Sequence, residues 1–483
     1  MTPTGPTELT PFARRIVPGL VAIAFFMEAL DTTILNTAVP TISAALGVAP
    51  LSMKAVLSSY TLSLAVFIPI SGWMADRFGT RRVFAAAIGL FTLGSLLCGI
   101  ASNIHVLVAC RILQGCGGAM MVPVGRLTLI RTFAKSELLR TMSFVAIPGL
   151  IGPMLGPLAG GLIVAYLHWR LIFFVNLPIG ALGLLMVYLH LPDYRETDTH
   201  PLDIVGLILF GSGIALLSYV LEVFGEHTLG TFEILSLLAV SIVLLAGYGM
   251  HAQHMKFPLL RLSLFKLRTF AVATIGSFIT RIGIGGAPFL LPLLYQVGLG
   301  YSPVQSGLLI MPQVMGAMSS KAIVQWLLRR IGYRGMLVSN TVILGCGLMF
   351  FATIGPDTPV WRIVVQAFLY GICTSLQYTS MNTLTYADVA PQQTSGASSI
   401  ASTLQQMSMS FGVATAGLCT AFFVPESLRS DPALFIDGLH KAFLTLGAAT
   451  ILTSSMFYRL KRGDGSNVSQ QKTAATGDAN AAS

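Results

Sequence analysis

Long, unbroken apolar runs dominate this sequence and limit what it can fold into. The runs extend for about 20 residues, the length that an α-helix needs to cross the roughly 30 Å hydrocarbon layer of a bilayer. Strands of a membrane barrel would instead alternate apolar and polar residues over about 10 positions. Of the 483 residues, 54% are hydrophobic and only 10% are charged, too few charges to cover a water-exposed surface of this size. The sequence therefore predicts an all-α integral membrane protein and excludes a soluble enzyme, a disordered chain or a nucleic-acid-binding domain.

About fourteen spans are predicted, and they divide the chain into two halves with an insertion between them. An N-terminal six-helix bundle (1–191) is expected to hold spans at 17–40, 53–74, 83–101, 105–128, 142–165 and 171–191. A linker (192–268) holds two more, at 204–222 and 232–251. A C-terminal six-helix bundle (269–460) holds spans at 269–295, 304–328, 335–354, 361–385, 396–424 and 439–459. The polar composition of residues 461–483 predicts a disordered tail.

Basic residues gather on one side of the predicted membrane. With an even number of spans both termini share a side, and the loops there carry about four times as many Arg and Lys residues as the opposite loops. This bias predicts that both termini are cytoplasmic. The net charge of +10 is then a topology signal and not a surface for nucleic acid.

An internal repeat relates the two bundles. Residues 77–81 read RFGTR and residues 330–334 read RIGYR, an offset of 253 positions from Arg81 to Arg334. The same offset carries Glu28, in the first span, to Arg281, in the ninth. Two six-helix halves related by an axis along the membrane normal are a transporter architecture, so the seventh and eighth spans are interpreted as an insertion.

Ionisable side chains inside the predicted spans are rare, and they are the first candidates for function. Each costs roughly 2.5–3.5 kcal/mol at mid-membrane unless a partner or a water-filled cavity receives it. Glu28 and Asp31 are three positions apart, so they share one face of the first helix. Asp31 and Arg111, in the fourth span, lie at similar depths when each helical residue adds about 1.5 Å. An ion pair between them is therefore feasible.

Two roles are open for this pair. A carboxylate that gains and loses a guanidinium neighbour can take up and release a proton when one helix moves, as proton coupling requires. Alternatively, the pair only locks the first and fourth helices together. Arg281 is also open to two interpretations, because it lacks an obvious acidic partner in its own half. It faces either Glu28 across the midline or an anionic substrate.

Polar residues within the predicted spans are candidates for the wall of a substrate cavity. They are Asn36, Tyr60, Arg281, Gln313, Gln377, Asn382 and Gln405. Because a buried amide needs a hydrogen-bond partner, contacts between helices are the simpler explanation for most of the amides, and a substrate contact is the second.

The loop after the second span reads GWMADRFGTRR at residues 72–82. Gly72 and Gly79 allow tight turns and close helix approach, and Asp76 can cap a helix N-terminus. The loop also holds the basic residues Arg77, Arg81 and Arg82. A simple topology anchor explains these basic residues but not the acid.

The fifth span contains GPMLGPLAGG at residues 152–161. Gly152, Gly156 and Gly160 recur every four residues and line one helix face, which allows a neighbouring helix to pack closely. The motif also holds Pro153, Pro157 and Gly161, and the prolines are expected to kink the helix. A general packing face is the alternative to a specific role.

Together with LDTTILNTAVP at 30–40 and RILQGCGG at 111–118, these motifs resemble the major facilitator superfamily, and within it the 14-helix drug:proton antiporter family. The resemblance covers nearly the whole chain. It implies a bacterial inner-membrane transporter, monomeric and without a cofactor or metal, whose partners are a small-molecule substrate, protons and the bilayer. No feature of the sequence identifies a periplasmic adaptor.

The resemblance also implies roles for the site residues. Asp31 and Glu28 would carry the proton, with Arg111 modulating them. The 72–82 loop would latch the two halves on the cytoplasmic side, and the 152–161 motif would prevent leak and favour exchange. In the second half Arg329 stands at the position matching Asp76, so any latch there must differ.

Multidrug efflux in exchange for protons is therefore the expected function. An exporter of an anionic metabolite, such as a carboxylate or a siderophore, is the first alternative, because Arg111 and Arg281 would suit an anion. A non-transporting membrane sensor or scaffold is the second. An importer is disfavoured only by the resemblance of the 152–161 motif.

Overall fold

The computed structural model describes residues 11–133, 135–196, 199–223, 230–390, 393–424, 432–461 and 463–465. These residues form helices and connecting loops without any strand, so the prediction of an all-α fold is confirmed for them. The first half comprises α1 (Pro11–Ile34), α2 (Val39–Leu46), α3 (Lys54–Phe78), α4 (Thr80–Ile100), α5 (Ile104–Thr132), α6 (Lys135–Tyr166), α7 (Leu171–Phe174) and α8 (Asn176–His190). The inserted hairpin comprises α9 (Ile204–Val223) and α10 (Thr231–His254). The second half comprises α11 (Arg268–Gly285), α12 (Ala287–Leu293), α13 (Pro303–Ser319), α14 (Val324–Phe350), α15 (Val360–Thr385), α16 (Thr394–Phe423) and α17 (Pro432–Phe457).

Ten helical segments in the described part of the chain are long and apolar enough to cross a membrane, so the protein is a multi-pass membrane protein. They include both helices of the inserted hairpin, α9 and α10. Among the other long helices, α6 contributes only the shorter apolar stretch Ile151–Tyr166. α15 and α16 are less apolar because Ser, Thr and Gln residues interrupt their runs. These two helices carry polar groups into the interior, where a solute could contact them.

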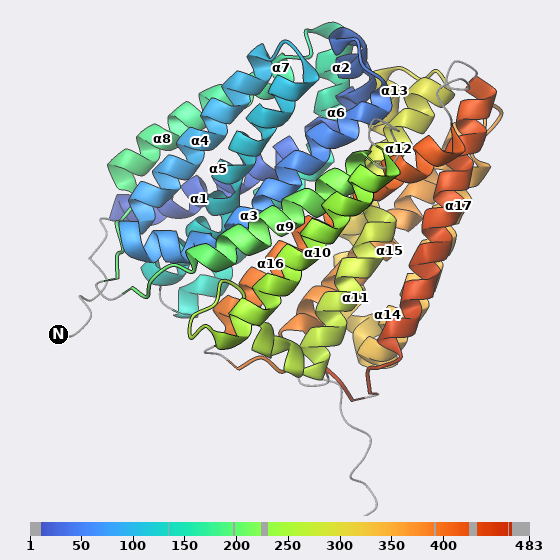
Figure 1. Cartoon of the computed structure of the whole chain (residues 1–483). Helices are drawn as coiled ribbons and strands as arrows, with labels where there is room; N and C mark the ends of the chain where they lie inside the picture. The colour runs from blue at the N-terminus through green and yellow to red at the C-terminus, as the bar shows by residue number, and fades with distance from the viewer. Residues whose placement is uncertain are drawn as a thin grey trace, which may run out of the picture.

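Helix packing within each half follows the internal repeat. In the first half α1 packs against α6, and α5 packs against both α3 and α4. In the second half α11 packs against α16, and α15 packs against both α13 and α14. The hairpin lies in front of the boundary between the halves, where α9 contacts both α3 and α16 (Figure 1).

The two copies of the repeated loop share a backbone corner. Gly79 joins α3 to α4 with φ +94°, and Gly332 interrupts α14 with φ +71° and ψ 167°. The two glycines are 253 positions apart, the offset of the sequence repeat. A positive φ of this kind favours glycine because a Cβ atom would crowd the backbone.

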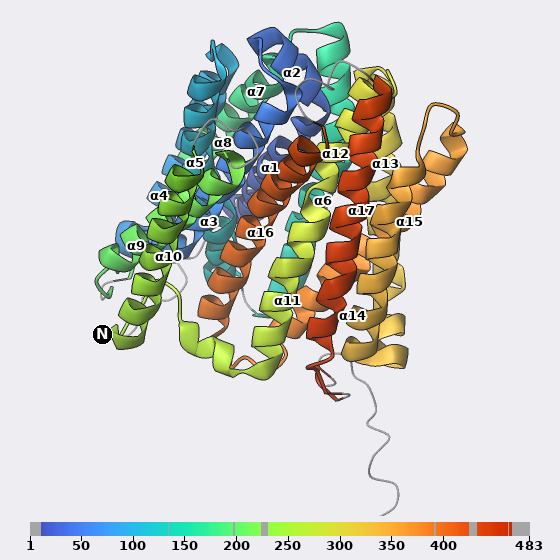
Figure 2. The same ribbon diagram turned by 45° about the vertical axis from the view of Figure 1, so that its right-hand side comes forward.

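Direct contacts between the halves concentrate at one end of the bundle, which we call the closed end. α2 and α12 lie toward this end, opposite the end where α17 finishes (Figure 2). Here α6 packs on α13, and the N-terminal part of α3 packs on α16. Among the described residues, both hydrogen bonds that join the halves directly lie at this end. They are Gln296 Nε2 to the Thr37 carbonyl, 2.8 Å, and Ser410 Oγ to the Ser58 carbonyl, 3.2 Å.

The first residues of the predicted tail take part in an ion pair. The Lys461 amide donates to Asp464 Oδ2 at 2.8 Å, and Asp464 Oδ1 lies 2.6 Å from Arg268 Nη2 at the start of α11. These contacts hold Asp464 beside the start of α11, and the disorder predicted for residues 461–483 stays a prediction. Residues 466–483 lie outside the described part of the chain.

Substitution of Gly79 tests the first corner. Gly79→Ala should lower stability by about 1–2 kcal/mol, because a non-glycine residue pays that much at positive φ. The new Cβ would also meet the Asp193 carboxylate. Gly89→Ala, within α4, is the matched control, since the nearest atom to its new Cβ is Leu184 Cδ2 of α8, an ordinary contact 3.9 Å away. The thermal midpoint of each variant in detergent measures the difference, and equal midpoints would contradict this account of Gly79.

Candidate functional site

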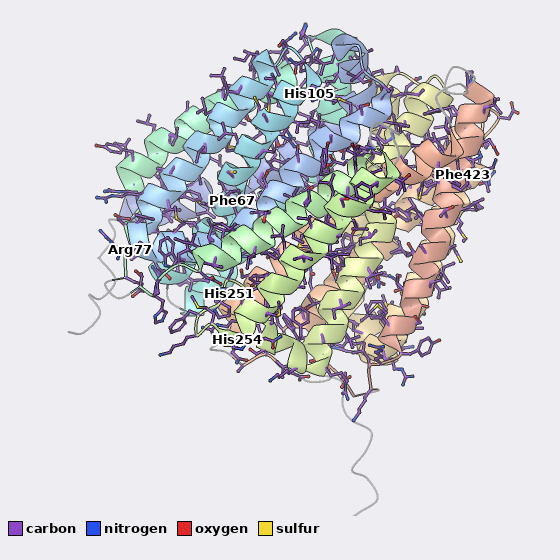
Figure 3. The ribbon with its side chains drawn as sticks, viewed as in Figure 1. Phe67, Arg77, His105, His251, His254 and Phe423 are labelled. Carbon is purple, nitrogen blue, oxygen red and sulfur yellow. The ribbon has the colours of Figure 1, made fainter. Side chains whose placement is uncertain are left out.

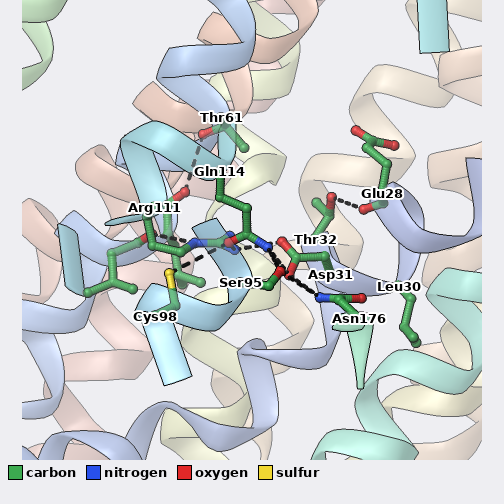
Figure 4. A network of polar contacts seen from close by, with 12 residues as sticks. Glu28, Leu30, Asp31, Thr32, Thr61, Ser95, Cys98, Arg111, Gln114 and Asn176 are labelled. Atoms are coloured by element: carbon green, nitrogen blue, oxygen red, sulfur yellow. Dashed lines mark hydrogen bonds and ion pairs between the residues drawn. The ribbon is translucent and has the colours of Figure 1, made fainter. Parts of the chain in front are cut away.

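A buried polar network lies where α1, α4, α5 and α8 meet (Figure 4). Asp31 Oδ2 accepts a hydrogen bond from Arg111 Nη1 at 2.6 Å, and both side chains are almost completely buried, 0% and 1% exposed. Asp31 Oδ1 accepts from Gln114 Nε2 at 2.8 Å and from Asn176 Nδ2 at 3.2 Å. The carboxylate is therefore held by three donors from two other helices.

The arginine is held as firmly as the acid. Arg111 Nη1 also donates to Gln114 Oε1 at 2.7 Å, and Nε donates to the Val56 carbonyl at 3.4 Å. The guanidinium carbon lies 4.1 Å from the centre of the Tyr60 ring, a cation–π distance. Ser95 completes the network by accepting from Gln114 Nε2 at 2.7 Å and from Asn176 Nδ2 at 3.2 Å.

The sequence of α5 explains how this geometry forms. Arg111 and Gln114 are three positions apart and so project from one face of the helix. The glycines that follow let α3 approach closely. A Cβ at Gly115 would sit 2.6 Å from Ser63 Cβ, and a Cβ at Gly118 would sit 2.9 Å from the Tyr60 hydroxyl. The motif at 111–118 thus combines polar groups with the space that brings α3 against them.

Glu28 stands apart from this network. It lies one turn before Asp31 on α1 and is partly exposed, and Figure 4 shows its carboxylate directed away from Asp31. The backbone carbonyl of Glu28 accepts a hydrogen bond from Thr32 Oγ1 at 2.7 Å. Its carboxylate forms no ion pair or hydrogen bond with another described residue.

Arg281 is the counterpart of Glu28 in the second half, and the two do not pair in this structure. Arg281 is 2% exposed and forms no ion pair with a described carboxylate. Its Nε donates to Ser277 Oγ at 3.0 Å, and Nη2 lies 3.5 Å from Asn382 Oδ1. The guanidinium carbon is 3.6 Å from the centre of the Tyr378 ring. A proposed contact between Arg281 and Glu28 across the midline is therefore absent.

A small polar cavity borders Arg281 in the second half, between α11, α15 and α16. Its lining includes Ser277 and Asn382, the two side chains that make polar contacts with Arg281, together with Thr274 and Gln405. Thr274 Oγ1 is buried without a hydrogen-bond partner among the described residues. Asn382 and Gln405 line this cavity, and their contact with a substrate stays a prediction; Thr274 is a lining residue that the sequence analysis did not name.

The remaining cavity candidates fall in different places. Gln377 is fully buried, with Oε1 accepting from Asn340 and Nε2 donating to Thr341 Oγ1, so its amide joins α15 to α14 and is not at a cavity. The Tyr60 ring packs under Arg111, and its hydroxyl has no described partner. Asn36 and Gln313 are half-buried.

The loop motif is organised within the first half. Asp76 Oδ1 lies 2.8 Å from Arg131 Nη2 of α5, and the same guanidinium is 3.0 Å from Glu196 Oε1. The expectation that Asp76 caps a helix is wrong, because Asp193 Oδ1 accepts from the Arg81 amide at the start of α4, 3.1 Å away.

The rest of the loop motif is directed to solvent. Gly72, Arg77, Arg81 and Arg82 are exposed. Arg77 lies toward the end that also holds His251 and His254, away from His105 and Phe423 at the other end (Figure 3). None of the described contacts of this motif reaches the second half, so a latch between the halves is not formed in this structure.

The fifth-span motif joins α1 to the opposite half. Gly152, Gly156 and Gly160 lie against α1, and a Cβ at Gly152 would sit 2.9 Å from both Ala29 Cβ and the Leu30 nitrogen. The next residue, Gly161, faces α13 instead, where a Cβ would lie 2.5 Å from the Pro303 carbonyl oxygen.

Pro153 and Pro157 both lie within α6. Pro157 contacts both the segment that follows α1 and the second half. The Pro157 carbonyl accepts from Thr37 Oγ1 at 3.0 Å, and it lies where a Cβ at Gly307 of α13 would be 2.5 Å away. α6 is therefore packed tightly between the helix that carries Asp31 and the other half.

Comparisons with known proteins agree with this architecture. The sequence profile of the Major Facilitator Superfamily matches residues 21–413. The "Putative multidrug resistance protein MdtD" of Serratia proteamaculans is 41% identical over 425 residues, covering 88% of each chain. The protein of the same name from Pectobacterium atrosepticum is 41% identical over 443 residues, covering 91% of this chain and 94% of that one.

Solved structures share the fold at low sequence identity. A bacterial homologue of the human lysosomal transporter Spinster, inward-facing and unoccupied, has a TM-score of 0.66 at 14% identity, covering 96% of this chain and all of that one (100%). A D-xylose–proton symporter also has a TM-score of 0.66 at 14% identity, covering 94% of this chain and 99% of that one. The profile match and the two relatives carry the assignment: the chain belongs to the Major Facilitator Superfamily of membrane transporters.

Proposed function

We propose that this protein exports small molecules across the bacterial inner membrane in exchange for protons, with multidrug efflux as its function. The observation that carries the proposal is the completely buried Asp31–Arg111 pair, 2.6 Å apart, inside a multi-pass helical bundle. Buried ionisable residues inside a membrane mark proton relays or substrate pathways in transporters. The names of the MdtD relatives support drug efflux as the cargo class.

The proposed topology has fourteen spans with both termini in the cytoplasm. The bias of Arg and Lys toward one set of loops supports it. The closed end then faces the periplasm, and the structure corresponds to a state open toward the cytoplasm. The loop motif around Asp76 lies on the cytoplasmic side, where its lack of contact with the second half fits this state.

The coupling we propose begins when Asp31 takes up a proton. Neutral Asp31 no longer balances Arg111, and a charge left unpaired inside the bundle is costly, so the ties between α1 and α5 rearrange. α1 moves together with α6, because the glycines of the 152–161 motif place their backbones in contact. α6 in turn touches α13 at the closed end, so a change at Asp31 biases the contact between the halves.

Glu28 is proposed as the group that meets the cargo or a second proton. Its partly exposed carboxylate has no described partner, so it is available to a cation in a way that Asp31 is not. This separates the two acids of the first helix into a bound one and an available one.

An anionic metabolite is the second candidate cargo, and one observation favours it. Arg281 is buried, borders the polar cavity and lacks a carboxylate partner among the described residues. Arg111 gives this candidate no further support, because Asp31 already neutralises it. A non-transporting sensor or scaffold would show no solute flux in proteoliposomes.

Removing the charge of Asp31 tests the proton role. Asp31→Asn should lower pH-gradient-driven efflux of a lipophilic cation from proteoliposomes by about tenfold or more, since each 1.4 kcal/mol of lost coupling is a factor of ten. Asp437→Asn is the control, because this carboxylate is exposed and lies in a surface pair with Lys441. Full efflux by Asp31→Asn would rule out Asp31 as the proton carrier.

Truncation of Arg281 separates the two cargo classes. For the proposed drug efflux, Arg281→Ala should leave export of a lipophilic cation within about twofold of the parent, because a cation gains nothing from a guanidinium. An anion exporter should instead lose export of organic acids, and the parent should export them. Arg362→Ala, an arginine at the start of α15 that contacts Thr353, is the matched control for both assays. Acid export that depends on Arg281 would overturn the drug assignment.

Removing the arginine of the buried pair tests how much the pair contributes to the stability of the protein. Arg111→Met should destabilise the protein by about 3–5 kcal/mol, because Asp31 is then buried with its charge uncompensated. Asp31→Asn combined with Arg111→Met should recover part of this loss, since neither charge remains. Thermal unfolding in detergent measures both, and a single variant as stable as the parent would show that the pair contributes little.

A further inference from the structure

Lys54 occupies an unusual position at the closed end. Its side chain is only 2% exposed, although lysine is almost never fully buried unless it is paired. Its backbone belongs to α3 of the first half. Its methylene stem lies against α16 of the second half, where a Cβ at Gly417 would sit 2.7 Å from Lys54 Cδ. Its ammonium reaches the inserted hairpin, with Nζ donating to the Glu222 carbonyl at 2.6 Å.

The end of α9 is a suitable acceptor for this cation. Glu222 lies in the last turn of α9, where backbone carbonyls lack partners within the helix and the helix dipole is negative. The Glu222 side chain makes a second tie, because Ser58 Oγ, one turn after Lys54 on α3, donates to Glu222 Oε1. Two bonds therefore attach this end of the hairpin to the first half.

The same residues also meet the second half. The Ser58 carbonyl accepts from Ser410 Oγ of α16 at 3.2 Å. Two to three turns earlier in α9, Phe210 and Ile214 pack in one apolar cluster with Met407 and Phe411 of α16. α9 is thus bonded to α3 and in apolar contact with α16, along the boundary between the halves (Figure 1).

We propose that the inserted hairpin is part of the gate at the closed end, with Lys54 as the locking residue. The hairpin moves with the first half, to which Lys54 and Ser58 tie it, and it covers the boundary with α16. The Lys54 stem in the space beside Gly417 resists separation of α3 from α16. When this end opens, the Lys54 stem moves away from Gly417 while its ammonium stays hydrogen-bonded to the Glu222 carbonyl.

This inference rests on alternating access in the proposed function, but its test reads a distance between the halves and not solute flux. Failure of transport and failure of the lock are therefore distinguishable. Spin labels at Leu167→Cys, after α6, and Phe422→Cys, near the end of α16, report on the closed end, since both positions are exposed. The full chain carries Cys346→Ser, which removes the exposed native cysteine, and this chain without the new cysteines sets the labelling background.

Lys54→Met keeps the length of the side-chain stem but removes the ammonium. The fraction of molecules with a long distance between the labels at positions 167 and 422 should therefore rise about threefold or more. The Cβ added by Gly417→Ala crowds the Lys54 stem from the second half and should also raise the fraction of long distances. This variant keeps the test available if Lys54→Met fails to fold. Lys441→Met is the control, because this lysine is 51% exposed on α17. Distances equal to the parent in every folded variant at Lys54 and Gly417 would overturn the lock.

A third label tests which half carries the hairpin. Phe232→Cys, at the start of α10, is 83% exposed. In the Gly417→Ala background its distance to position 167 should stay constant, while its distance to position 422 should lengthen. A constant distance to 422 with a longer distance to 167 would assign the hairpin to the second half and overturn this part of the proposal.

Discussion

The buried contact between Asp31 and Arg111 is the interaction on which the first half depends. Neither charge could remain in a medium of low dielectric constant without the other, and the pair alone leaves further donors and acceptors unsatisfied. Gln114, Asn176 and Ser95 satisfy them, and this requirement brings α1, α4, α5 and α8 to one point. The arrangement of these four helices therefore depends on keeping the acid and the arginine together.

Contact between backbones carries this dependence outward. Glycine positions on α6 let it lie directly against α1, and its opposite side presses on α13. Helices packed this closely cannot slide independently, because small displacements produce overlaps between main-chain atoms. The second half shows a different chemistry, because Arg281 lies against Tyr378 beside a polar cavity and has no acidic partner among the residues that the structure describes. The first half thus contains a charged network, and the second half contains a polar cavity.

Much of this could be predicted from the sequence. The length of the apolar runs indicates a helical membrane protein, and the 253-residue offset indicates a duplication whose packing the structure repeats. The depths of Asp31 and Arg111 in two spans made their contact feasible, and the structure confirms it. The partners Ser95 and Asn176 are harder to predict, because a lone Ser or Asn in an apolar run has no pattern that says which neighbour it meets.

Other features depend on contacts between distant segments. Asp193 caps α4 from 112 positions away, and this contact depends on where the chain after α8 returns. Lys54 stands at the start of the predicted span 53–74, and no pattern in the sequence indicates that its side chain is buried. Its burial follows from the hairpin, whose position against α3 and α16 is set by tertiary packing. Gln377 resembles Gln405 as a polar residue in a span, and only its two bonded neighbours distinguish it as a packing residue.

The matching corners at Gly79 and Gly332 have a consequence for the history of the chain. Around the first corner, Asp76, Arg131 and Glu196 form an ionic cluster, whereas the position equivalent to Asp76 in the second copy holds Arg329. The two copies thus share the backbone bend but differ in the side chains around it. A duplicated transporter half can therefore exchange the chemistry of a loop while keeping its path, which leaves one copy free to acquire a new role without refolding the bundle.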